Sequence, residues 1–373
     1  MNLLPSSHSR RTPTASLSPI IIPDDLIEEV LSCLTVKTLM RMRCVSKSWK
    51  SLISDSTFVK LHLHRSSPKA DFTVVYKSGS NSVSFTVIRL FENPPIFFTL
   101  PNYELIDEGE QLVGSCNGLL CLVGYSRVNG GIDIESWFRF WNPATGTMSQ
   151  RLGYLLNDET IPPRFTFGSD KSNNAYKVLA LMHTNVRVFS LQDNAWRNIE
   201  NPPVARNCSM NPVYLSGSVN WLASHGVSII YPQFVIISFD LGSESHTQYP
   251  TPPGFDLLPS VHAPNLTVLK ECLCFCHDFK QTHFVIWLMK EFGVEDSWTQ
   301  FLKISYHNLL LDPFEDLVSF LVPLCLSEKN DTLLLAHEYK QVTILYSWSD
   351  NTLALGPWWC TCLNYVESLV SHC

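Results

Sequence analysis

A strand that ends in an aromatic residue before a polar turn recurs five times in the chain. The copies read RFWNPATG, RVFSLQDN, ISFDLGSE, VIWLMKEF and ILYSWSDN. Their aligned aromatic residues, which are separated by 48, 50, 48 and 59 residues, are Trp141, Phe189, Phe239, Trp287 and Tyr346. This spacing is typical of one four-stranded blade of a β-propeller. The repeat therefore predicts a ring of antiparallel sheets.

The region from Phe72 onward has the pattern of strands throughout. Short apolar runs are broken about every eight to twelve residues by Gly, Asn, Asp, Pro or Ser, which is an all-β pattern. A degenerate first copy, FTVVYKSGSNSVSFTVIRL, brings the expected number of blades to six, with seven as the alternative. A closed ring needs its last edge to be paired, and a strand around Tyr365 to Leu369 is expected to complete the first blade.

The repeated aromatic residues are expected to lie in the core between blades, because large rings at a regular spacing supply most of the buried area there. Contacts to a target are expected from loops at one rim, where the sequence departs from the repeat. The candidate loops are 157–168, 201–211, 251–264 and 308–315. The candidate substrate-binding residues within them are Arg164, Arg206, Phe255, His262 and Phe314.

A second hydrophobic pattern, with the period of a helix, precedes the strands. Its first apolar residues fall on one stripe with a period of 3.6 residues: Leu26, Ile27, Val30, Leu31 and Leu34. Pro23 and the acidic pair after it favour a helix start at this point. Thr38 is expected to cap a second short helix, and Ser46 a third. Three such helices bury too little apolar surface to be firmly stable alone, which suits a module that a partner completes.

The segment IPDDLIEEVLSCLTVKTLMRMRCVSKSWKSLISDSTF, from Ile22 to Phe58, resembles an F-box. The similarity rests on IP before an acidic helix start, on the VK joint and on the run RCVSKSW, whereas Thr35 stands where these modules usually have a second proline. An F-box implies docking on a Skp-type adaptor, which in turn binds a cullin. The adaptor-binding residues that the resemblance implies are Pro23, Leu26, Ile27, Val30, Leu31, Val36, Leu39, Val45 and Trp49.

Four segments of the later region resemble the F-box-associated, kelch-related domain of plant F-box proteins: NPATG, GSVNW, LMKEFGVEDSW and NYVESLVS. The double glycine of standard kelch blades is missing from most copies. The expected fold is α+β multidomain, with a three-helix F-box before an all-β propeller. The expected boundaries are a disordered leader at 1–19, the F-box at 20–65, a linker at 66–71 and the kelch-like propeller at 72–371.

Charge bears on the kind of partner. Between Thr35 and Arg65, seven Lys or Arg residues stand against one acid, Asp55, although the whole chain carries a net charge of −7. Such a cluster can be a solvated surface, or it can attract an acidic protein, because complementary charge raises encounter rates. Nucleic acid is not expected as a partner, because the cluster is short and the sequence pI is about 5.9.

The ends and the cysteines bear on the compartment. The first twenty residues overlap in composition with transit peptides, but three prolines there favour disorder. The start lacks the apolar core of a secretory signal, so the twelve cysteines are expected to be reduced, in the nucleus, the cytoplasm or both. No run of about eighteen apolar residues occurs, and no membrane contact is expected.

The run Cys272, Cys274, Cys276 and His277 has the content of a zinc site but not the spacing. Zinc knuckles use gaps of two to four residues and a matching second pair, whereas alternate cysteines are typical of one face of a strand. Neither a metal nor a cofactor is expected.

Two classes of function follow from this organisation. The leading one is the substrate-recognition subunit of an SCF-type (Skp–cullin–F-box) ubiquitin ligase, which bridges the adaptor and an unknown target protein and is not itself an enzyme. The alternative is a sugar-binding or enzymatic propeller whose helical module makes another protein contact. An enzyme needs converging carboxylates, metal ligands or an activated nucleophile, and none of these stands out in the sequence.

Overall fold

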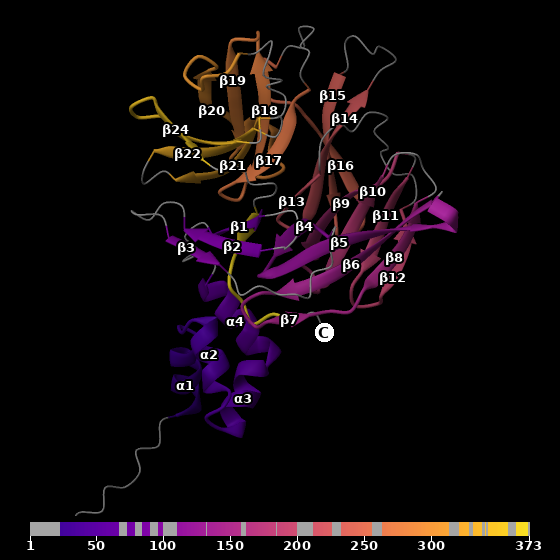
Figure 1. The fold of residues 1–373 in the computed structure, drawn as a ribbon, viewed down its shortest axis with the longest axis vertical. Coiled ribbons are helices and arrows are strands. Elements are labelled where there is room, and N and C mark those ends of the chain that lie inside the picture. The colour runs from indigo at the N-terminus through magenta and orange to yellow at the C-terminus, as the bar shows by residue number, and fades with distance from the viewer. Residues whose placement is uncertain are drawn as a thin grey trace, which may run out of the picture.

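The computed structural model describes residues 23–66, 73–78, 84–89, 96–99, 110–131, 133–157, 162–183, 185–199, 212–225, 233–255, 263–312, 321–327, 331–337, 340, 342–356 and 363–371. In these residues, four short helices are joined to a set of antiparallel sheets (Figure 1). The predicted leader and most of the predicted linker fall outside the described residues.

The helices are α1 (Asp24–Leu31), α2 (Val36–Met42), α3 (Lys47–Ser54) and α4 (Ser56–Ser66). The predicted cap of α3 is confirmed, because the Ser46 hydroxyl accepts the N–H of Trp49 at 3.1 Å. The predicted cap of α2 is wrong. Thr35 precedes this helix, and its hydroxyl accepts the N–H of Thr38 at 3.4 Å. Thr35, which stands where these modules usually have a proline, is therefore the N-terminal capping residue of α2.

Helix α4 corrects the expectation of three helices. The Asp55 carboxylate accepts the N–H of Thr57 at 2.8 Å at the start of α4. The buried residues of α4 are Phe58 and His62, four residues apart on one face. The His62 imidazole lies 2.9 Å from the carbonyl oxygen of Leu34. A polar residue on the inward face breaks the apolar stripe on which sequence-based detection of a helix depends.

The described strands form six antiparallel sheets. The first sheet consists of β25 (Leu363–Tyr365), β1 (Thr73–Ser78), β2 (Ser84–Arg89) and β3 (Ile96–Thr99), and the second of β4 (Gln111–Cys116), β5 (Leu119–Val128), β6 (Asp133–Asn142) and β7 (Thr147–Met148), with β8 (Leu152–Asn157) also paired to β6. The third sheet consists of β12 (Ala195–Asn198), β11 (Val186–Ser190), β10 (Tyr176–Leu181) and β9 (Arg164–Ser169), and the fourth of β13 (Val213–Leu215), β14 (Ser218–His225), β15 (Gln233–Asp240) and β16 (His246–Pro250). The fifth sheet consists of β17 (Asn265–Leu269), β18 (Cys272–Phe279), β19 (His283–Met289) and β20 (Trp298–Ser305), and the sixth of β21 (Leu321–Ser327), β22 (Thr332–His337), β23 (Val342–Ser347) and β24 (Thr352–Gly356).

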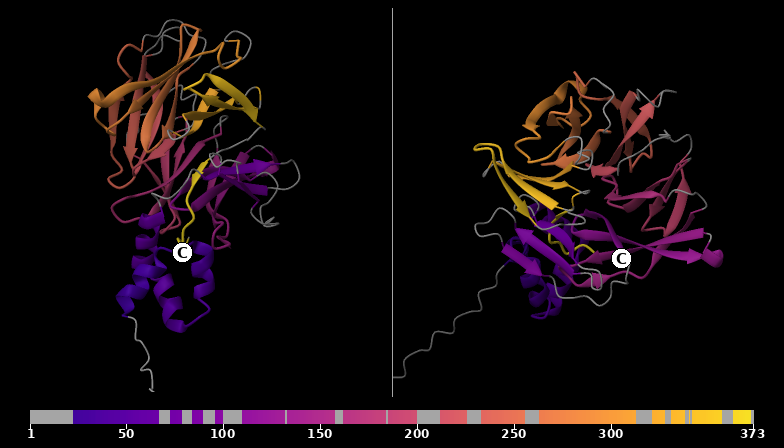
Figure 2. Two further views of the ribbon diagram at one scale, coloured as in Figure 1. Left: turned by 90° about the vertical axis from the view of Figure 1, so that its left-hand side faces the viewer. Right: turned by 45° about the horizontal axis from the view of Figure 1, so that its top comes forward.

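The sheets are arranged around a common centre, as the right-hand view of Figure 2 shows. Strands β4, β9, β13, β17 and β21 each lie at one edge of their sheet, and successive members of this series contact one another. They are therefore the innermost strands of their sheets. This architecture is the predicted β-propeller.

The five repeated aromatic residues each lie on the third strand of a sheet, namely β6, β11, β15, β19 and β23. Four of them are buried, as the sequence predicted: Trp141, Phe189, Phe239 and Tyr346. Trp287 is only half-buried, and its indole N–H donates to Nε2 of His277 at 3.3 Å. The repeat therefore marks equivalent strands, because each blade needs a large side chain at this position.

The first sheet combines both ends of the propeller region. Strand β25 pairs antiparallel with β1, with Tyr365 opposite Thr73 and Leu363 opposite Val75. The predicted closure of the first blade by a C-terminal strand is thus confirmed. Its predicted bounds are wrong, because the strand ends at Tyr365 and the following residues leave the sheet toward the helices (Figure 2, left).

Candidate functional site

The helices enclose a small hydrophobic core. Its buried residues are Leu31, Val36, Leu39, Ile53, Phe58 and Leu369. Five come from the helices, and Leu369 comes from the segment after β25. Three of the nine predicted adaptor-binding residues, Leu31, Val36 and Leu39, thus lie inside the module.

The other predicted adaptor-binding residues lie on or near the surface. Ile27 and Trp49 are half-buried against the core. Pro23 is exposed, and Leu26, Val30 and Val45 are exposed by 54%, 62% and 62%. Leu26 and Val30 are four residues apart on α1 and therefore share a face. An apolar surface of this kind on a small module marks a site of protein contact.

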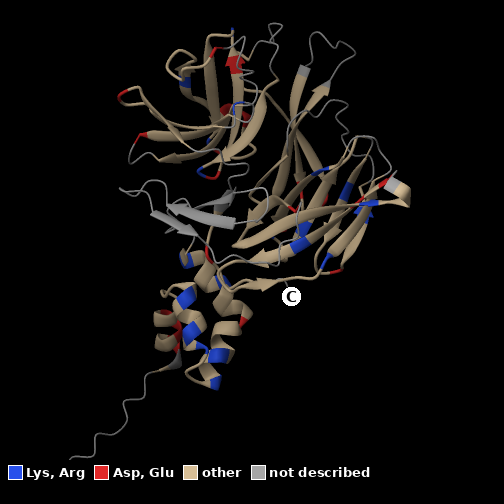
Figure 3. Cartoon of the chain, viewed as in Figure 1, with Lys and Arg blue, Asp and Glu red and all other residues tan. Residues whose placement is uncertain are grey.

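Basic residues are frequent on the helices that follow α1 (Figure 3), whereas α1 itself carries acids such as Glu28 and Glu29. Five of the seven are exposed: Lys37, Arg41, Lys47, Lys50 and Lys60. Arg65 is different, because its guanidinium pairs with the Glu29 carboxylate at 2.8 Å and ties α4 to α1. The exposed basic residues make the module electrostatically suited to an acidic protein.

The four loops predicted to contact a target share one place in the topology. They precede or include the starts of the innermost strands β9, β13, β17 and β21. Because each innermost strand runs in the same direction through the ring, these four strands begin at one end. The turn at the other end of β4, Asn117-Gly118, contacts the segment that enters the helical core. The four strands that follow the predicted target-binding loops therefore begin at the end away from the helices, whereas loop 201–211 and parts of the other three loops fall outside the described residues.

Two of the five predicted substrate-binding residues are described. Arg164 is the first residue of β9, opposite Leu181 on β10, and is half-buried. Phe255 is also half-buried and packs edge-on against Phe275 at 4.9 Å between ring centroids. The structure does not bring them together in one described site. Arg206, His262 and Phe314 fall outside the described residues.

Phe255 also packs against His277, with ring centroids 5.0 Å apart. Burial lowers the pKa of His277. The Nε2 atom of the neutral ring accepts the Trp287 indole N–H at 3.3 Å, so Nδ1 carries the proton and donates it to the Asp278 carbonyl at 2.9 Å. Both nitrogens are used, and this histidine has a structural role.

Sequence reasoning missed three exposed apolar residues in the second sheet: Tyr125, Tyr154 and Leu156. Tyr125 lies on β5, and the others lie on β8, which pairs with β6 as a fifth strand. The run LGYLLN, which forms β8, has the alternating pattern of a strand. It was missed because the sequence repeat predicts only four strands in each blade.

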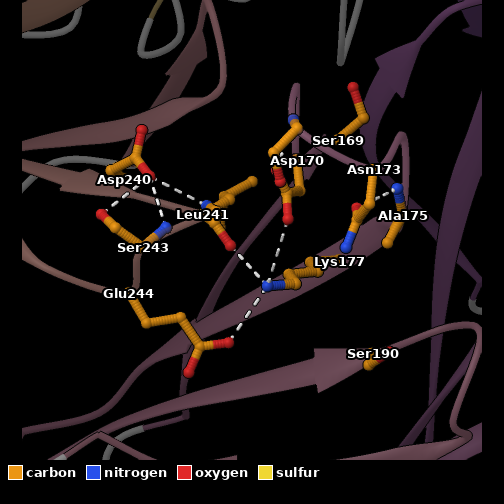
Figure 4. A network of polar contacts seen from close by, with 12 residues as sticks. Ser169, Asp170, Asn173, Ala175, Lys177, Ser190, Asp240, Leu241, Ser243 and Glu244 are labelled. Atoms are coloured by element: carbon orange, nitrogen blue, oxygen red, sulfur yellow. Dashed lines mark hydrogen bonds and ion pairs between the residues drawn. The ribbon is translucent and has the colours of Figure 1, made fainter.

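The polar cluster in Figure 4 joins the third and fourth sheets. Lys177 on β10 donates to the carbonyl of Leu241 and lies 3.0 Å from the Glu244 carboxylate. Asp170 lies 3.9 Å from Lys177. Burial opposes ionisation of Asp170, but hydrogen bonds from Ser172 and the charge of Lys177 together outweigh it, and the pKa of this carboxyl is lowered. The cluster is an ion network between blades.

The buried cysteines among the described residues are suited to packing rather than to catalysis. Cys272, Cys274 and Cys276 alternate along β18, which confirms that they belong to a strand. Burial raises the pKa of Cys116 and Cys121, and of Cys274 and Cys276, so these thiols are poor nucleophiles. Within the described ranges, no three His, Cys, Asp or Glu side chains are grouped as metal ligands would be. In the same ranges, no helix has the length and apolarity needed to span a bilayer.

Comparison with known proteins identifies both parts of the chain. The family model for the F-box domain matches residues 20–61. The model for the F-box associated beta propeller domain matches residues 75–372, which is most of the chain.

The chain is also similar to F-box proteins of a plant. An F-box/kelch-repeat protein of Arabidopsis thaliana is 28% identical over 356 residues, which cover 89% of this chain and 89% of that protein. The F-box protein CPR1 of the same plant is 26% identical over 326 residues, which cover 76% of this chain and 73% of that protein. Among solved structures, a chain of the nidogen/laminin complex aligns with a TM-score of 0.45 and 8% identity, over 79% of this chain and 99% of that chain.

Proposed function

Because the chain belongs to the family of plant F-box proteins that carry an F-box associated β-propeller domain, we propose that it is the substrate-recognition subunit of an SCF-type ubiquitin ligase. This combination of domains supports such a role in general, and F-box proteins of this type are generally non-catalytic adaptors. In this role, the F-box binds a Skp-type adaptor, and the adaptor in turn binds a cullin. The propeller binds a target protein.

The observation that carries the proposal is the exposed apolar surface of the F-box. The core of the module is already filled by its own side chains and Leu369, so Leu26, Val30 and Val45 are not needed inside it. Burying an exposed valine or leucine side chain against a partner contributes about 1.5–3 kcal/mol. The five exposed basic residues of α2, α3 and α4 favour an acidic partner.

The arrangement of the two parts supports the role of the propeller. The strands that follow the loops proposed to contact a target begin at the end away from the F-box, so a partner at each end can be bound at once. The contribution of this chain to ubiquitin transfer is then to position the target protein. Holding an acceptor lysine near a charged conjugating enzyme raises its effective concentration, and no catalytic group on this chain is needed. We propose the nucleus, the cytoplasm or both as the place of this role.

The substitution Val30→Asp tests adaptor binding. Val30 is 62% exposed, so the F-box should keep its fold, whereas the charge would be desolvated in a complex. We expect copurification with a Skp-type adaptor to fall by more than about tenfold, or about 1.4 kcal/mol. The matched control is Leu355→Asp on β24, where the leucine is 64% exposed.

If the Val30→Asp variant copurifies with the adaptor in the same yield as the wild type, the proposed contact is contradicted. If the wild-type protein itself captures no adaptor, the F-box does not dock in this way, and the alternative of a sugar-binding or enzymatic propeller gains support.

A further inference from the structure

The six residues after β25, 366–371, form an extended segment between the propeller and the F-box; we refer to it as the coupling segment. Ser368, Leu369 and Val370 are buried. The Ser368 hydroxyl donates to the carbonyl of Asn117, in the β4–β5 turn, at 2.6 Å. The segment therefore lies against a turn of the second sheet.

Asn142, the last residue of β6, holds the coupling segment from a second side. Its side-chain N–H₂ donates to the carbonyl of Ser368 at 3.0 Å and to that of Val370 at 2.7 Å. Its side-chain oxygen accepts the N–H of Ala144 at 3.0 Å and caps the β6–β7 turn. A fully buried side chain thus joins a propeller turn to the coupling segment.

Gly118 adapts the β4–β5 turn to this contact. Its φ of +79° favours glycine. A Cβ atom at this position would also collide with the Ser368 hydroxyl and the Val366 carbonyl. The turn and the coupling segment are therefore in closer contact than any other residue at 118 would allow.

Between its two anchored neighbours, the segment places Leu369 in the core of the F-box. Leu369 packs there with Leu31, Val36, Leu39, Ile53 and Phe58, and Ala144 of the β6–β7 turn packs against the same core. One hydrophobic core thus contains residues from the helices, from the second blade and from the coupling segment. Figure 2 (left) shows the segment running from the sheets into the helices.

We propose that the coupling segment fixes the orientation of the F-box on the propeller, with Asn142, Ser368 and Leu369 as positioning residues for ubiquitin transfer. The positioning role rests on the proposed ligase function, whereas the fixed orientation does not. A rigid joint holds the target-binding end at one distance and angle from the adaptor. Only those lysines of a target that meet the charged conjugating enzyme in this geometry then react rapidly.

The variant Asn142→Asp tests the coupling without removing the turn. Asp240 occupies the equivalent last position of β15, and its carboxylate caps the following turn by accepting the N–H of Gly242 at 2.9 Å. An aspartate at 142 can therefore still accept the N–H of Ala144. Its second oxygen, however, would face the carbonyls of Ser368 and Val370 and repel them. The matched control is Asp240→Asn, which keeps a cap and touches no coupling segment.

The primary measurement is small-angle X-ray scattering of the full chain, alone and bound to the Skp-type adaptor, with hydrogen exchange of residues 366–371. For Asn142→Asp, we expect a larger maximum dimension, faster exchange of the segment and unchanged adaptor binding. If the Asn142→Asp variant shows the same maximum dimension and the same exchange rate of residues 366–371 as the wild type, the proposal is overturned, whether or not the protein supports ubiquitination.

Leu369→Ala tests the same joint from the F-box side, with Leu355→Ala on β24 as the control. It should show the same increase in dimension. Because the target is unknown, autoubiquitination in a reconstituted ligase gives the readout. Both coupling variants should modify a wider set of the chain's own propeller lysines than the wild type does, a change that lower stability alone would not produce. An unchanged lysine pattern together with altered scattering would overturn the positioning role and leave the joint itself supported.

Discussion

At the scale of single residues, the strongest constraint is a buried cation. Lys177 is 5% exposed and is satisfied by one backbone carbonyl and two carboxylates. Glu244 also pairs with Arg197 at 2.6 Å, so the network reaches the surface. Removing one member of a buried ion pair is costly, because its partners keep their charge without compensation.

The substitution Lys177→Met should therefore lower the free energy of unfolding by about 3 kcal/mol. Methionine matches the stem of lysine but leaves Asp170 and Glu244 facing an apolar group. A thermal melt followed by circular dichroism measures the effect as a lower midpoint. The control is Lys171→Met at a neighbouring exposed site, which should change stability by less than about 0.5 kcal/mol. Equal midpoints for the two variants would show that the network contributes little.

At the scale of elements, the short strand β25 has an effect beyond its length. It occupies the innermost position of the first sheet, next to β4 of the second. Without β25, β1 would have an unpaired edge at the centre of the propeller. The strand also leads directly into the coupling segment, so one C-terminal stretch both completes a blade and reaches the F-box.

Removing residues 364–373 should lower the melting temperature by roughly 10 °C, if the lost pairing and burial amount to about 4 kcal/mol. The exposed edge of β1 should also make the truncated protein prone to aggregate. Size-exclusion chromatography and a thermal melt test both effects, with removal of residues 372–373 as the control. A truncated protein that stays monomeric and melts with the control would place ring closure elsewhere.

At the scale of the whole molecule, the F-box and the propeller are not independent units joined only by a chain. They share the core around Leu369, although the helical and strand patterns of the sequence are separate. A module of about 45 residues is marginally stable on its own. The burial of Leu369 from the coupling segment therefore contributes noticeably to the stability of the F-box. The propeller has cores of its own in every described sheet from the second to the sixth.

The two parts should consequently respond differently to separation. A fragment of residues 68–373 should keep a β-type circular dichroism spectrum and a cooperative melt, but it should not bind the adaptor. A fragment of residues 20–66 should melt well below the F-box in the full chain, because Leu369 is missing from its core. A helical fragment as stable as the intact F-box would show that the shared core is incidental.

Much of this fold could be predicted from local patterns. The five aromatic residues mark the third strand of five sheets, and the cap at Ser46 lies where its helix begins. Helix α4 could not be found in this way, because its inward face includes His62, whose partner is a carbonyl 28 residues away. Among the predicted adaptor-binding residues, the apolar pattern did not separate buried Leu31 from exposed Val30, its neighbour on α1.

The local sequence determines the type and order of the elements, because helix and strand periods, turn glycines and capping side chains act within a few residues. Tertiary structure alone decides which surfaces meet. Asn142 and Val370 are 228 residues apart, and only the closed propeller brings them to 2.7 Å and places Leu369 among the helices. Such contacts have no local signal, since their energy depends on burial between segments that the whole fold has first to bring together.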